Sequence, residues 1–257
     1  MNTSGQIPSA PKFQFKPNWK ILLFTLLLLP LLLSLGVWQL QRAEEKKTIQ
    51  ESWQAQQALP PVPFAEIKDS AEVEFRRVSL RGRFDGEHYW LLENRILDGK
   101  LGYEIVMPFI TTEDELVIVN RGWLPAGAYR SDLPQVPTAA DVVSISGSLA
   151  QPSDNRFIAE QPEPPQQWPA KILQVDLATL GAHLNALGYE REPYRRVLRI
   201  DGEAPGAFTA HWQPINMSPA THKGYAVQWF TMAAALLILS MFANSNLAEA
   251  LFKSRSS

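Results

Sequence analysis

Cysteine is absent from all 257 residues of the chain. Its absence excludes disulfide bonds, a Cys-x-x-Cys redox site, covalent haem attachment through Cys-x-x-Cys-His, and any copper or zinc site with a cysteine ligand. The five methionines are scattered, which argues against a methionine-based copper relay. The Gly-x-Ser-x-Gly, His-Glu-x-x-His and glycine-rich phosphate-binding motifs are missing too. No familiar catalytic motif therefore points to an active site.

A large net charge is also lacking, because the formal net charge is only −2, and this argues against nucleic acid as a partner. The charges are nevertheless unevenly placed. Residues 1–20 carry three lysines and no acidic residue, residues 41–223 carry 19 basic and 25 acidic side chains, and residues 244–257 carry two basic residues and one acidic residue. Basic ends around an acidic middle fit the positive-inside rule. We therefore expect both termini in the cytoplasm and the middle exported.

An apolar run over residues 21–37 predicts a first membrane span, which extends to residue 40. A cleaved signal peptide is the alternative interpretation. Such a peptide has an apolar region of about 7–15 residues and then a small-x-small cleavage site, whereas the sequence here continues Leu35-Gly36-Val37-Trp38-Gln39-Leu40. We expect an uncleaved anchor, followed by a polar helix that ends near Gln57 because prolines cluster at positions 60, 61 and 63.

The second span begins after Ser218, a good N-cap residue, with Pro219 in the first helical position. A helix over residues 219–243 would be about 37 Å long at 1.5 Å per residue. That length exceeds a hydrocarbon core of about 30 Å. Since the apolar part begins only at Tyr225, the first turn is expected at the level of the lipid headgroups.

This first turn contains His222 and Lys223, and Tyr225 and Trp229 suit an aromatic belt at the membrane interface. His222, Tyr225 and Trp229 are spaced i, i+3 and i+7, so they share one helix face. A membrane span that opens with an interfacial histidine is the best candidate site in the chain.

Between the spans the hydrophobic period changes to two, which is typical of β-strands. In residues 75–84 the apolar side chains alternate with arginines and a serine. The Asp85-Gly86 pair predicts a hairpin turn that leads to a returning strand over 88–92. A second hairpin is predicted from 102–110 to 115–120.

Further strands are predicted over 142–149 and 194–200, and a helix is predicted from an N-cap at Asp176 to Gly188. The predicted fold class is a membrane protein in which two transmembrane helices flank a mainly antiparallel β (α+β) exported domain. Its parts are a cytoplasmic segment 1–20, a span 21–40, an exported β-rich domain 41–218, a span 219–243 and a cytoplasmic tail 244–257.

Few residues of the exported domain are candidates for chemistry. Arg77, Arg81 and Arg83 form a stripe that could bind carboxylates or phosphates, or could simply be the solvated face of a sheet. The cluster Asn120-Arg121-Gly122-Trp123-Leu124-Pro125 could be a structural turn or a site. His88, in a strand, and His183, beside a leucine stripe, favour structural roles.

Five motifs, in this order along the chain, resemble those of the Surfeit locus protein 1 family. Together with both spans they cover nearly the whole chain. In this sequence they are Leu35-Gly36-Val37-Trp38-Gln39-Leu40-Gln41-Arg42, Leu80-Arg81-Gly82-Arg83-Phe84-Asp85, Met107-Pro108-Phe109, Val119-Asn120-Arg121-Gly122-Trp123-Leu124-Pro125 and His222-Lys223-Gly224-Tyr225-Ala226-Val227-Gln228-Trp229-Phe230. The last motif departs from its familiar form, which often has an apolar residue after the histidine where this chain has Lys223.

The resemblance implies a non-enzymatic assembly factor for haem-copper cytochrome c oxidase in the bacterial cytoplasmic (inner) membrane. Its expected cofactor is haem a, held transiently by His222 as ligand to the iron, with Lys223, Tyr225 and Trp229 nearby. Its expected partners are the catalytic subunit of the oxidase, the haem a synthesis machinery and membrane lipid. Partner or propionate contacts are expected of four arginines, namely Arg77, Arg81, Arg83 and Arg121.

Two alternatives from other classes stay open at this point. A membrane-anchored scaffold would stabilise an assembly intermediate of the oxidase without binding haem. A membrane-tethered hydrolase would need a serine or aspartate within hydrogen-bond reach of His88 or His183 in a concave pocket.

Overall fold

A computed structural model of the protein describes residues 14–129, 132–138, 140–152, 155, 158 and 163–246. The chain forms two compact units, one made of residues 1–50 and 215–257 and the other of residues 51–214. Most of the predicted cytoplasmic segments 1–20 and 244–257 lies outside the described residues. The basic residues that carry the charge argument at the C-terminal end therefore have no structural description.

Two helices dominate the first unit, α1 (Trp19–Gln57) and α4 (Pro219–Ala243). Both are long and apolar enough, by length and composition, to cross a membrane. The predicted first span and the polar helix after it are one continuous helix, which passes through Pro30 and ends before the proline cluster. Helix α4 begins at its predicted N-cap, because Ser218 Oγ accepts a hydrogen bond from the Thr221 backbone N–H at 3.2 Å.

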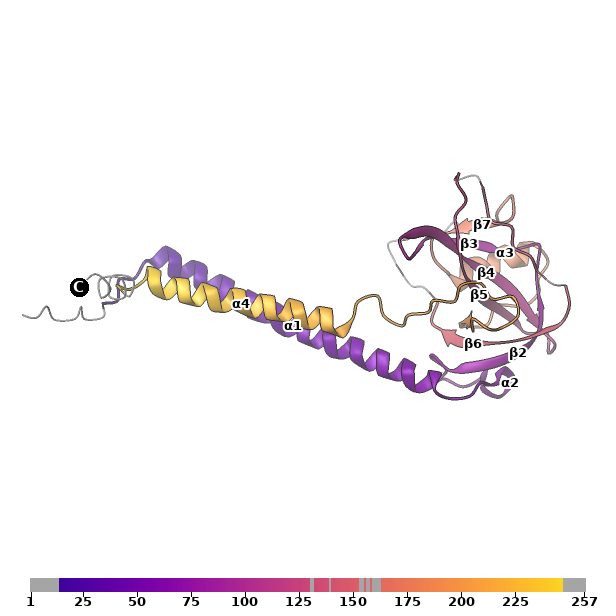
Figure 1. The fold of residues 1–257 in the computed structure, drawn as a ribbon, viewed down its shortest axis with the longest axis horizontal. Helices are drawn as coiled ribbons and strands as arrows, with labels where there is room; N and C mark the ends of the chain where they lie inside the picture. The colour runs from indigo at the N-terminus through magenta and orange to yellow at the C-terminus, as the bar shows by residue number, and fades with distance from the viewer. Residues whose placement is uncertain are drawn as a thin grey trace, which may run out of the picture. The chain divides into compact units, whose positions relative to one another are not determined.

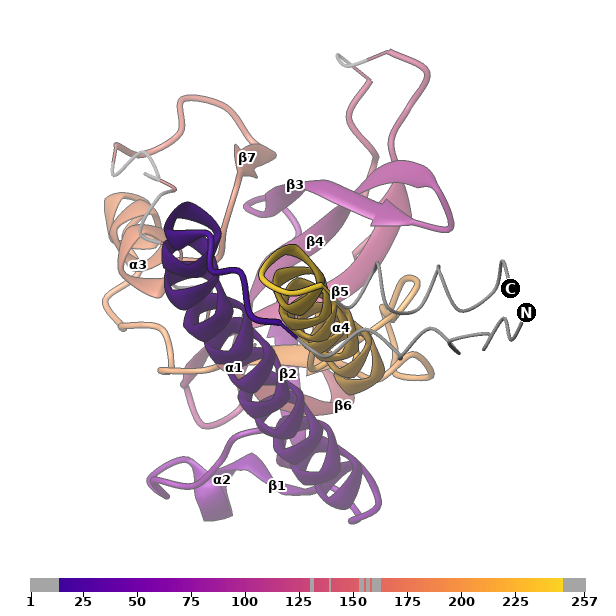
Figure 2. The same ribbon diagram turned by 90° about the vertical axis from the view of Figure 1, so that its left-hand side faces the viewer.

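Helices α1 and α4 lie side by side and antiparallel (Figures 1 and 2). Thr25 Oγ1 near the start of α1 donates to Ser240 Oγ near the end of α4 at 3.1 Å, within a buried contact. Further along α1, Gly36 faces Phe230, and a Cβ atom at position 36 would lie 2.5 Å from that ring. A larger side chain at position 36 would therefore require the Phe230 ring to move.

The buried residues of these two helices follow a regular spacing. On α4, Ala226, Ala233 and Ser240 are buried and lie seven residues apart. On α1 the buried residues lie seven, four and seven residues apart and are Thr25, Leu32, Gly36 and Ala43. This spacing is that of helices packed along a heptad seam. The seam consists mainly of small side chains.

A short polar junction joins the N-terminal end of α1 to the C-terminal end of α4. The Asn244 side chain accepts a hydrogen bond from the Asn18 N–H at 2.6 Å, and the Asn244 carbonyl accepts one from the Lys16 N–H at 2.7 Å. Gln14 N–H donates to the Asn246 side chain at 2.7 Å. These bonds satisfy backbone groups at one helix start and one helix end, where no intrahelical partner exists.

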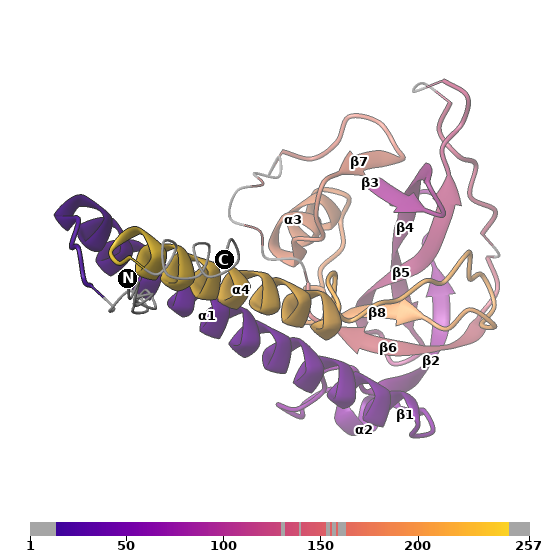
Figure 3. The same cartoon turned by 60° about the vertical axis from the view of Figure 1, so that its left-hand side comes forward.

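The second unit is a strongly curved sheet (Figure 3). Its strands are β1 (Val62–Pro63), β2 (Arg77–Phe84), β3 (Trp90–Leu97), β4 (Lys100–Thr111), β5 (Leu116–Pro125), β6 (Val143–Ala150), β7 (Ala170–Ile172) and β8 (Val197–Ile200). Their order is β1-β2-β6-β8-β5-β4-β3-β7, and β2 also pairs with β4. That pairing closes strands β2, β6, β8, β5 and β4 into a ring, so the arrangement resembles a small β-barrel. Helices α2 (Phe64–Ile67) and α3 (Leu177–Ala186) complete the unit.

The alternation predicted from the sequence is confirmed in β2, whereas the last four residues of β6 are all buried. In β2 the apolar positions Val78, Leu80, Gly82 and Phe84 are buried and the intervening positions are not. They join a core inside the ring that includes Ile105, Phe109 and Leu198. A second core lies on the other side of β4 and β5, where α3 supplies Leu180 and Leu184. Asp176 is the N-cap of α3, as predicted, and accepts from the Ala178 N–H.

The predicted hairpin at Asp85-Gly86 is wrong. Strand β2 pairs with β6 and, at its end, with β4, and it makes no pairing with β3. Asp85 Oδ1 instead accepts hydrogen bonds from the N–H groups of Glu87 and His88, which closes a local turn without returning the chain antiparallel. The hairpin is formed by the next Asp-Gly pair, Asp98-Gly99, between β3 and β4. Both residues have positive φ angles of 49° and 74°, as a two-residue hairpin turn of the favoured type requires.

The sheet is mainly antiparallel, as predicted, but three pairs of strands are parallel. They are β1 with β2, β3 with β7 and β5 with β8. The short strands β1 and β7 add edges to the ring, and the sequence gives no alternation long enough to predict either.

Replacing Gly36 with leucine should separate α1 from α4, because the added side chain meets the Phe230 ring. Overpacking of this kind costs about 1–3 kcal/mol. The cysteine-free chain offers a direct measurement, which is the yield of the disulfide between Thr25→Cys and Ser240→Cys under mild oxidation. We expect Gly36→Leu to lower that yield several-fold. Gly224→Leu is the matched control, since a Cβ atom there has no neighbour within 4 Å. An equal yield in both variants would contradict the packing of Phe230 against Gly36.

Candidate functional site

His222 lies in the first turn of α4 and is half-buried. Its Nδ1 atom is 2.8 Å from the side-chain oxygen Oε1 of Gln39 on α1. Because a carbonyl oxygen can only accept, Nδ1 carries the hydrogen of this bond. In the neutral ring the lone pair then sits on Nε2, to which no residue in the described part of the chain hydrogen-bonds.

The other residues predicted for this site lie along α4. Lys223 is exposed, Tyr225 has 42% of its surface exposed, and Trp229 is half-buried like His222. The buried seam residue Ala226 lies four positions after His222, so the histidine and Trp229 border the seam while Tyr225 lies further toward the outside. His222 and Trp229 thus lie beside the seam, whereas Lys223 and Tyr225 are exposed.

Ordinary metal-ion sites are not formed by the described residues. Among them no group of three or more histidine, cysteine, aspartate or glutamate side chains is placed to hold an ion. A single imidazole with an available Nε2 is instead the donor that suits an iron already held by a porphyrin, which needs only axial ligands from the protein. The donor set at His222 fits haem and does not fit a bare metal ion.

The structure does not bring the three stripe arginines into a single site. Arg77 is half-buried and donates to Asp201 Oδ2 at 2.8 Å, while the Ser146 hydroxyl donates to the same oxygen at 2.6 Å. Arg81 and Arg83 are exposed. The stripe is thus the outer face of β2, and one of its members is engaged in an internal ion pair.

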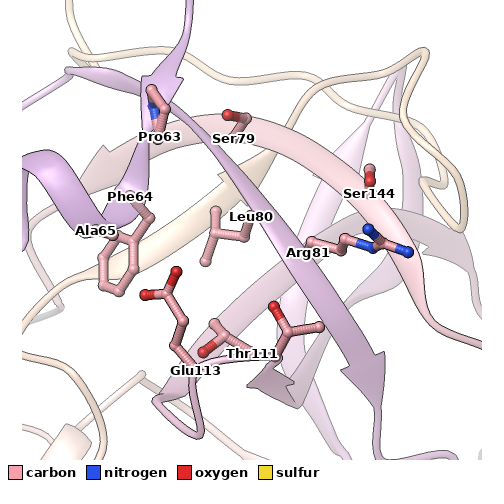
Figure 4. Close-up of a pocket in the computed structure, with 10 residues that line it drawn as sticks. Pro63, Phe64, Ala65, Ser79, Leu80, Arg81, Thr111, Glu113 and Ser144 are labelled. Carbon is pink, nitrogen blue, oxygen red and sulfur yellow. The ribbon is translucent and has the colours of Figure 1, made fainter.

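Arg81 also borders a cavity of about 230 Å³ between α2, β2 and the β4–β5 turn (Figure 4). Phe64 and Leu80 supply its apolar wall and Glu113 supplies a carboxylate. In the close-up, the Arg81 guanidinium points away from Glu113 (Figure 4). The two charged groups are therefore not arranged to hold one ligand between them.

Arg121 is buried, with only 2% of its surface exposed. Its guanidinium donates to the Gly206 carbonyl at 2.7 Å, to the Thr138 hydroxyl at 3.0 Å and to the Pro137 carbonyl at 3.3 Å. It also lies between the rings of Phe84 and Phe208, 4.7 and 4.8 Å from their centroids. Burial lowers the pKa of Arg121 to about 10. The arginine thereby ties two loops to the end of the ring, and its predicted contact with a partner or a propionate stays a prediction that this burial does not favour.

The neighbours of Arg121 in the same motif are also used internally. Asn120 Nδ2 donates to Glu104 Oε2 at 2.6 Å, and the Trp123 indole donates to the Arg95 carbonyl at 3.0 Å. Gly122 has φ of 104°, and a Cβ atom there would lie 2.9 Å from the Thr209 carbonyl oxygen. The motif is therefore a structural element, although it forms a bulged part of strand β5 rather than a turn.

The predicted histidines of the β-rich domain are held in local hydrogen bonds. His88 Nδ1 lies 2.7 Å from Asp85 Oδ2, and the Tyr189 hydroxyl donates to the same oxygen at 2.5 Å. Burial raises the pKa of Asp85, but hydrogen bonds from Tyr189, from the Glu87 N–H and from His88 outweigh it and bring the pKa below its usual value. His183 is buried and accepts a hydrogen bond from the Trp90 indole at 3.3 Å.

The pair of His88 and Asp85 meets part of the condition set for a hydrolase. A histidine and a carboxylate need a nucleophile beside them, and the side chain that meets them is Tyr189. Burial raises the pKa of Tyr189, and its hydrogen bond to Asp85 raises it further. A hydroxyl held protonated in this way is a poor nucleophile, so the contact stabilises the turn after β2.

The comparison with known proteins places the chain in a family. The model of the SURF1 family matches residues 26–234. This chain belongs to the SURF1 family. The resemblance drawn from the five motifs is therefore confirmed, and the matched range contains Gln39, Arg121 and His222.

Individual SURF1 relatives differ in how much they share with the chain. A SURF1-like protein of Rickettsia bellii is 26% identical over 211 residues, which cover 81% of this chain and 84% of the relative. Surfeit locus protein 1 of Gallus gallus is 24% identical over 234 residues, or 83% of this chain and 72% of the relative. A SURF1-like protein of Rickettsia felis is 39% identical over 103 residues, and that match covers 39% of this chain and 45% of the relative.

Replacing Arg121 with methionine should destabilise the protein by roughly 2–4 kcal/mol, because three part-buried hydrogen bonds and the contacts of the cation with two rings are lost. Replacing the exposed Arg81 with glutamine should change stability by no more than about 0.5 kcal/mol. Both changes in the free energy of unfolding are measured by denaturant unfolding of the purified protein, monitored by tryptophan fluorescence. If Arg121→Met were as stable as the wild type, the cost of burying the guanidinium charge would equal the stabilisation that its contacts provide.

Proposed function

We propose that the protein is a non-enzymatic assembly factor for haem-copper cytochrome c oxidase, and that it assists the delivery of haem a to the catalytic subunit or its insertion there. The supporting observation is the state of His222. Its Nδ1 is hydrogen-bonded to Gln39 and its Nε2 is available, at the start of a helix that is apolar enough to span a membrane. Membership of the SURF1 family supports the same role.

The residues of α4 supply what a haem needs from the protein. Haem a contributes an iron with an axial position that an imidazole can occupy. His222 would bind that iron through Nε2, the exposed Lys223 is suited to pair with a propionate, and Tyr225 and Trp229 offer aromatic surface beside the histidine. The basic side chain after the histidine makes this end of the helix more favourable for an anionic group than an apolar residue would.

A scaffold without haem is the second candidate. The exposure of Lys223 and Tyr225 on α4 favours it, because these side chains could equally contact a helix of the catalytic subunit. In that case His222 would serve the packing of α1 on α4 through Gln39. The same exposed stretch also suits contact with the haem a synthesis machinery. The experiment that separates the two candidates therefore measures bound haem.

The proposed location is the bacterial inner membrane with both termini in the cytoplasm and residues of the exported domain in the periplasm. Hydrogen bonds join Gln14 to Asn246 and Asn18 to Asn244, which supports placing both ends on one side of the membrane. The lysines at positions 12, 16 and 20 favour the cytoplasm as that side.

Single cysteines introduced into the cysteine-free chain should report this topology. In intact cells a membrane-impermeant maleimide is expected to label Lys100→Cys, at the exposed β3–β4 hairpin. It is expected to label Gln14→Cys only after the cells are opened. Equal labelling of both positions in intact cells would contradict the arrangement.

Replacing His222 with alanine should remove most of the haem that copurifies from cells making haem a. The protein should still insert and fold, because the buried seam residues and the hydrogen bond from Thr25 to Ser240 stay in place. The absorbance spectrum per mole of protein measures the haem. Trp229→Phe, which keeps an aromatic ring, should be milder. Unchanged haem in His222→Ala would exclude this ligand and leave the scaffold as the better candidate.

A further inference from the structure

We propose that Gln39 is the positioning residue for His222, and that its side-chain oxygen fixes the imidazole in the tautomer whose Nε2 can bind haem iron. This inference rests on the proposed function and deepens it. The protein's iron-binding group is then built from both membrane helices, because the ligand comes from α4 and its positioning residue from α1.

The geometry of the bond decides the tautomer. Gln39 Oε1 lies 2.8 Å from His222 Nδ1, a normal distance for an N–H···O bond. An unbound neutral histidine distributes its hydrogen between two ring nitrogens, and only one of the two tautomers leaves Nε2 free to bind a metal. The amide oxygen selects that tautomer and also restrains rotation of the ring.

Gln39 is half-buried on α1 and lies beside the buried residues of the seam. It lies three residues after Gly36 and four before Ala43, both of which are buried in the seam. Positions 32, 36, 39 and 43 thus follow one heptad-type stripe, and Gln39 is the polar member. A polar amide in this stripe costs desolvation unless it is hydrogen-bonded, and His222 is its hydrogen-bond partner on α4.

The chemical kind of the acceptor also carries information. Histidines that bind metals usually donate their second N–H to a carboxylate or carbonyl, which raises the basicity of the binding nitrogen. A neutral amide does this less strongly than a carboxylate would. Gln39 therefore makes His222 a competent ligand of moderate strength, which suits a protein that must release its haem to another one.

The test uses full-length protein purified from cells that make haem a, as wild type, Gln39→Leu, Gln39→Glu and Gln41→Leu. Gln41 is an exposed glutamine two residues away on the same helix and serves as the matched control. Haem content and the iron–histidine stretching frequency of the reduced form are measured for each. We expect Gln39→Leu to lower haem affinity by about 10–100-fold, the usual effect of losing such a partner. The iron–histidine stretching frequency of the haem that stays bound should also fall. Gln39→Glu should keep the haem and raise the frequency, and Gln41→Leu should match wild type.

Several outcomes would overturn the inference, and they are distinguishable. Unchanged haem content and frequency in Gln39→Leu, alongside loss of haem in His222→Ala, would overturn the role of Gln39 alone. Wild-type protein without haem, or His222→Ala with full haem, would overturn the proposed function and this inference together. The disulfide yield between Thr25→Cys and Ser240→Cys in the Gln39→Leu background separates positioning from packing. A collapse of that yield would mark Gln39 as a packing residue and overturn the inference.

Discussion

The packing of α1 against α4 is the constraint on which the proposed site depends. In lipid, apolar side chains gain little from leaving their solvent, so helices associate through tight packing and a few hydrogen bonds. Here small residues provide the packing, with Gly36 against Phe230, and two hydrogen bonds cross the seam, from Thr25 to Ser240 and between His222 and Gln39. Because the second of these bonds includes the candidate ligand, the geometry of the site follows from the packing of the helices.

The family motifs divide into two groups by what their side chains touch. The motifs of the sheet make contacts within the domain. Arg121 contacts two loops and two rings, Gly122 accommodates the Thr209 carbonyl, and the Trp123 indole donates a hydrogen bond to the β3 backbone. The motifs of the helices leave one atom available to bind a metal, which is Nε2 of His222. Residues that look equally suggestive as sequence thus have different roles, and burial separates them.

Much of the fold was accessible from the sequence because its causes are local. Ser218 and Asp176 cap helices with their own side chains, and the alternation in β2 reports its buried face directly. The hairpin after β2 could not be predicted, because two Asp-Gly pairs offer the same turn and only the pairing of β2 with β4 and β6 decides between them. The site was found in part. Its histidine followed from helix spacing, whereas Gln39 lies 183 residues away and only tertiary packing joins the two.

A histidine tied to a glutamine across two helices has a consequence for how the site responds to its surroundings. The bond exists only while the seam is closed, and separating the helices would free the imidazole to rotate and to exchange tautomers. Any partner that inserts between α1 and α4, or that pulls them apart, would weaken the ligand without touching the iron. Under the proposed function, release of haem would then depend on the packing of the two helices, which rests on the mainly small side chains of the seam and on two hydrogen bonds across it.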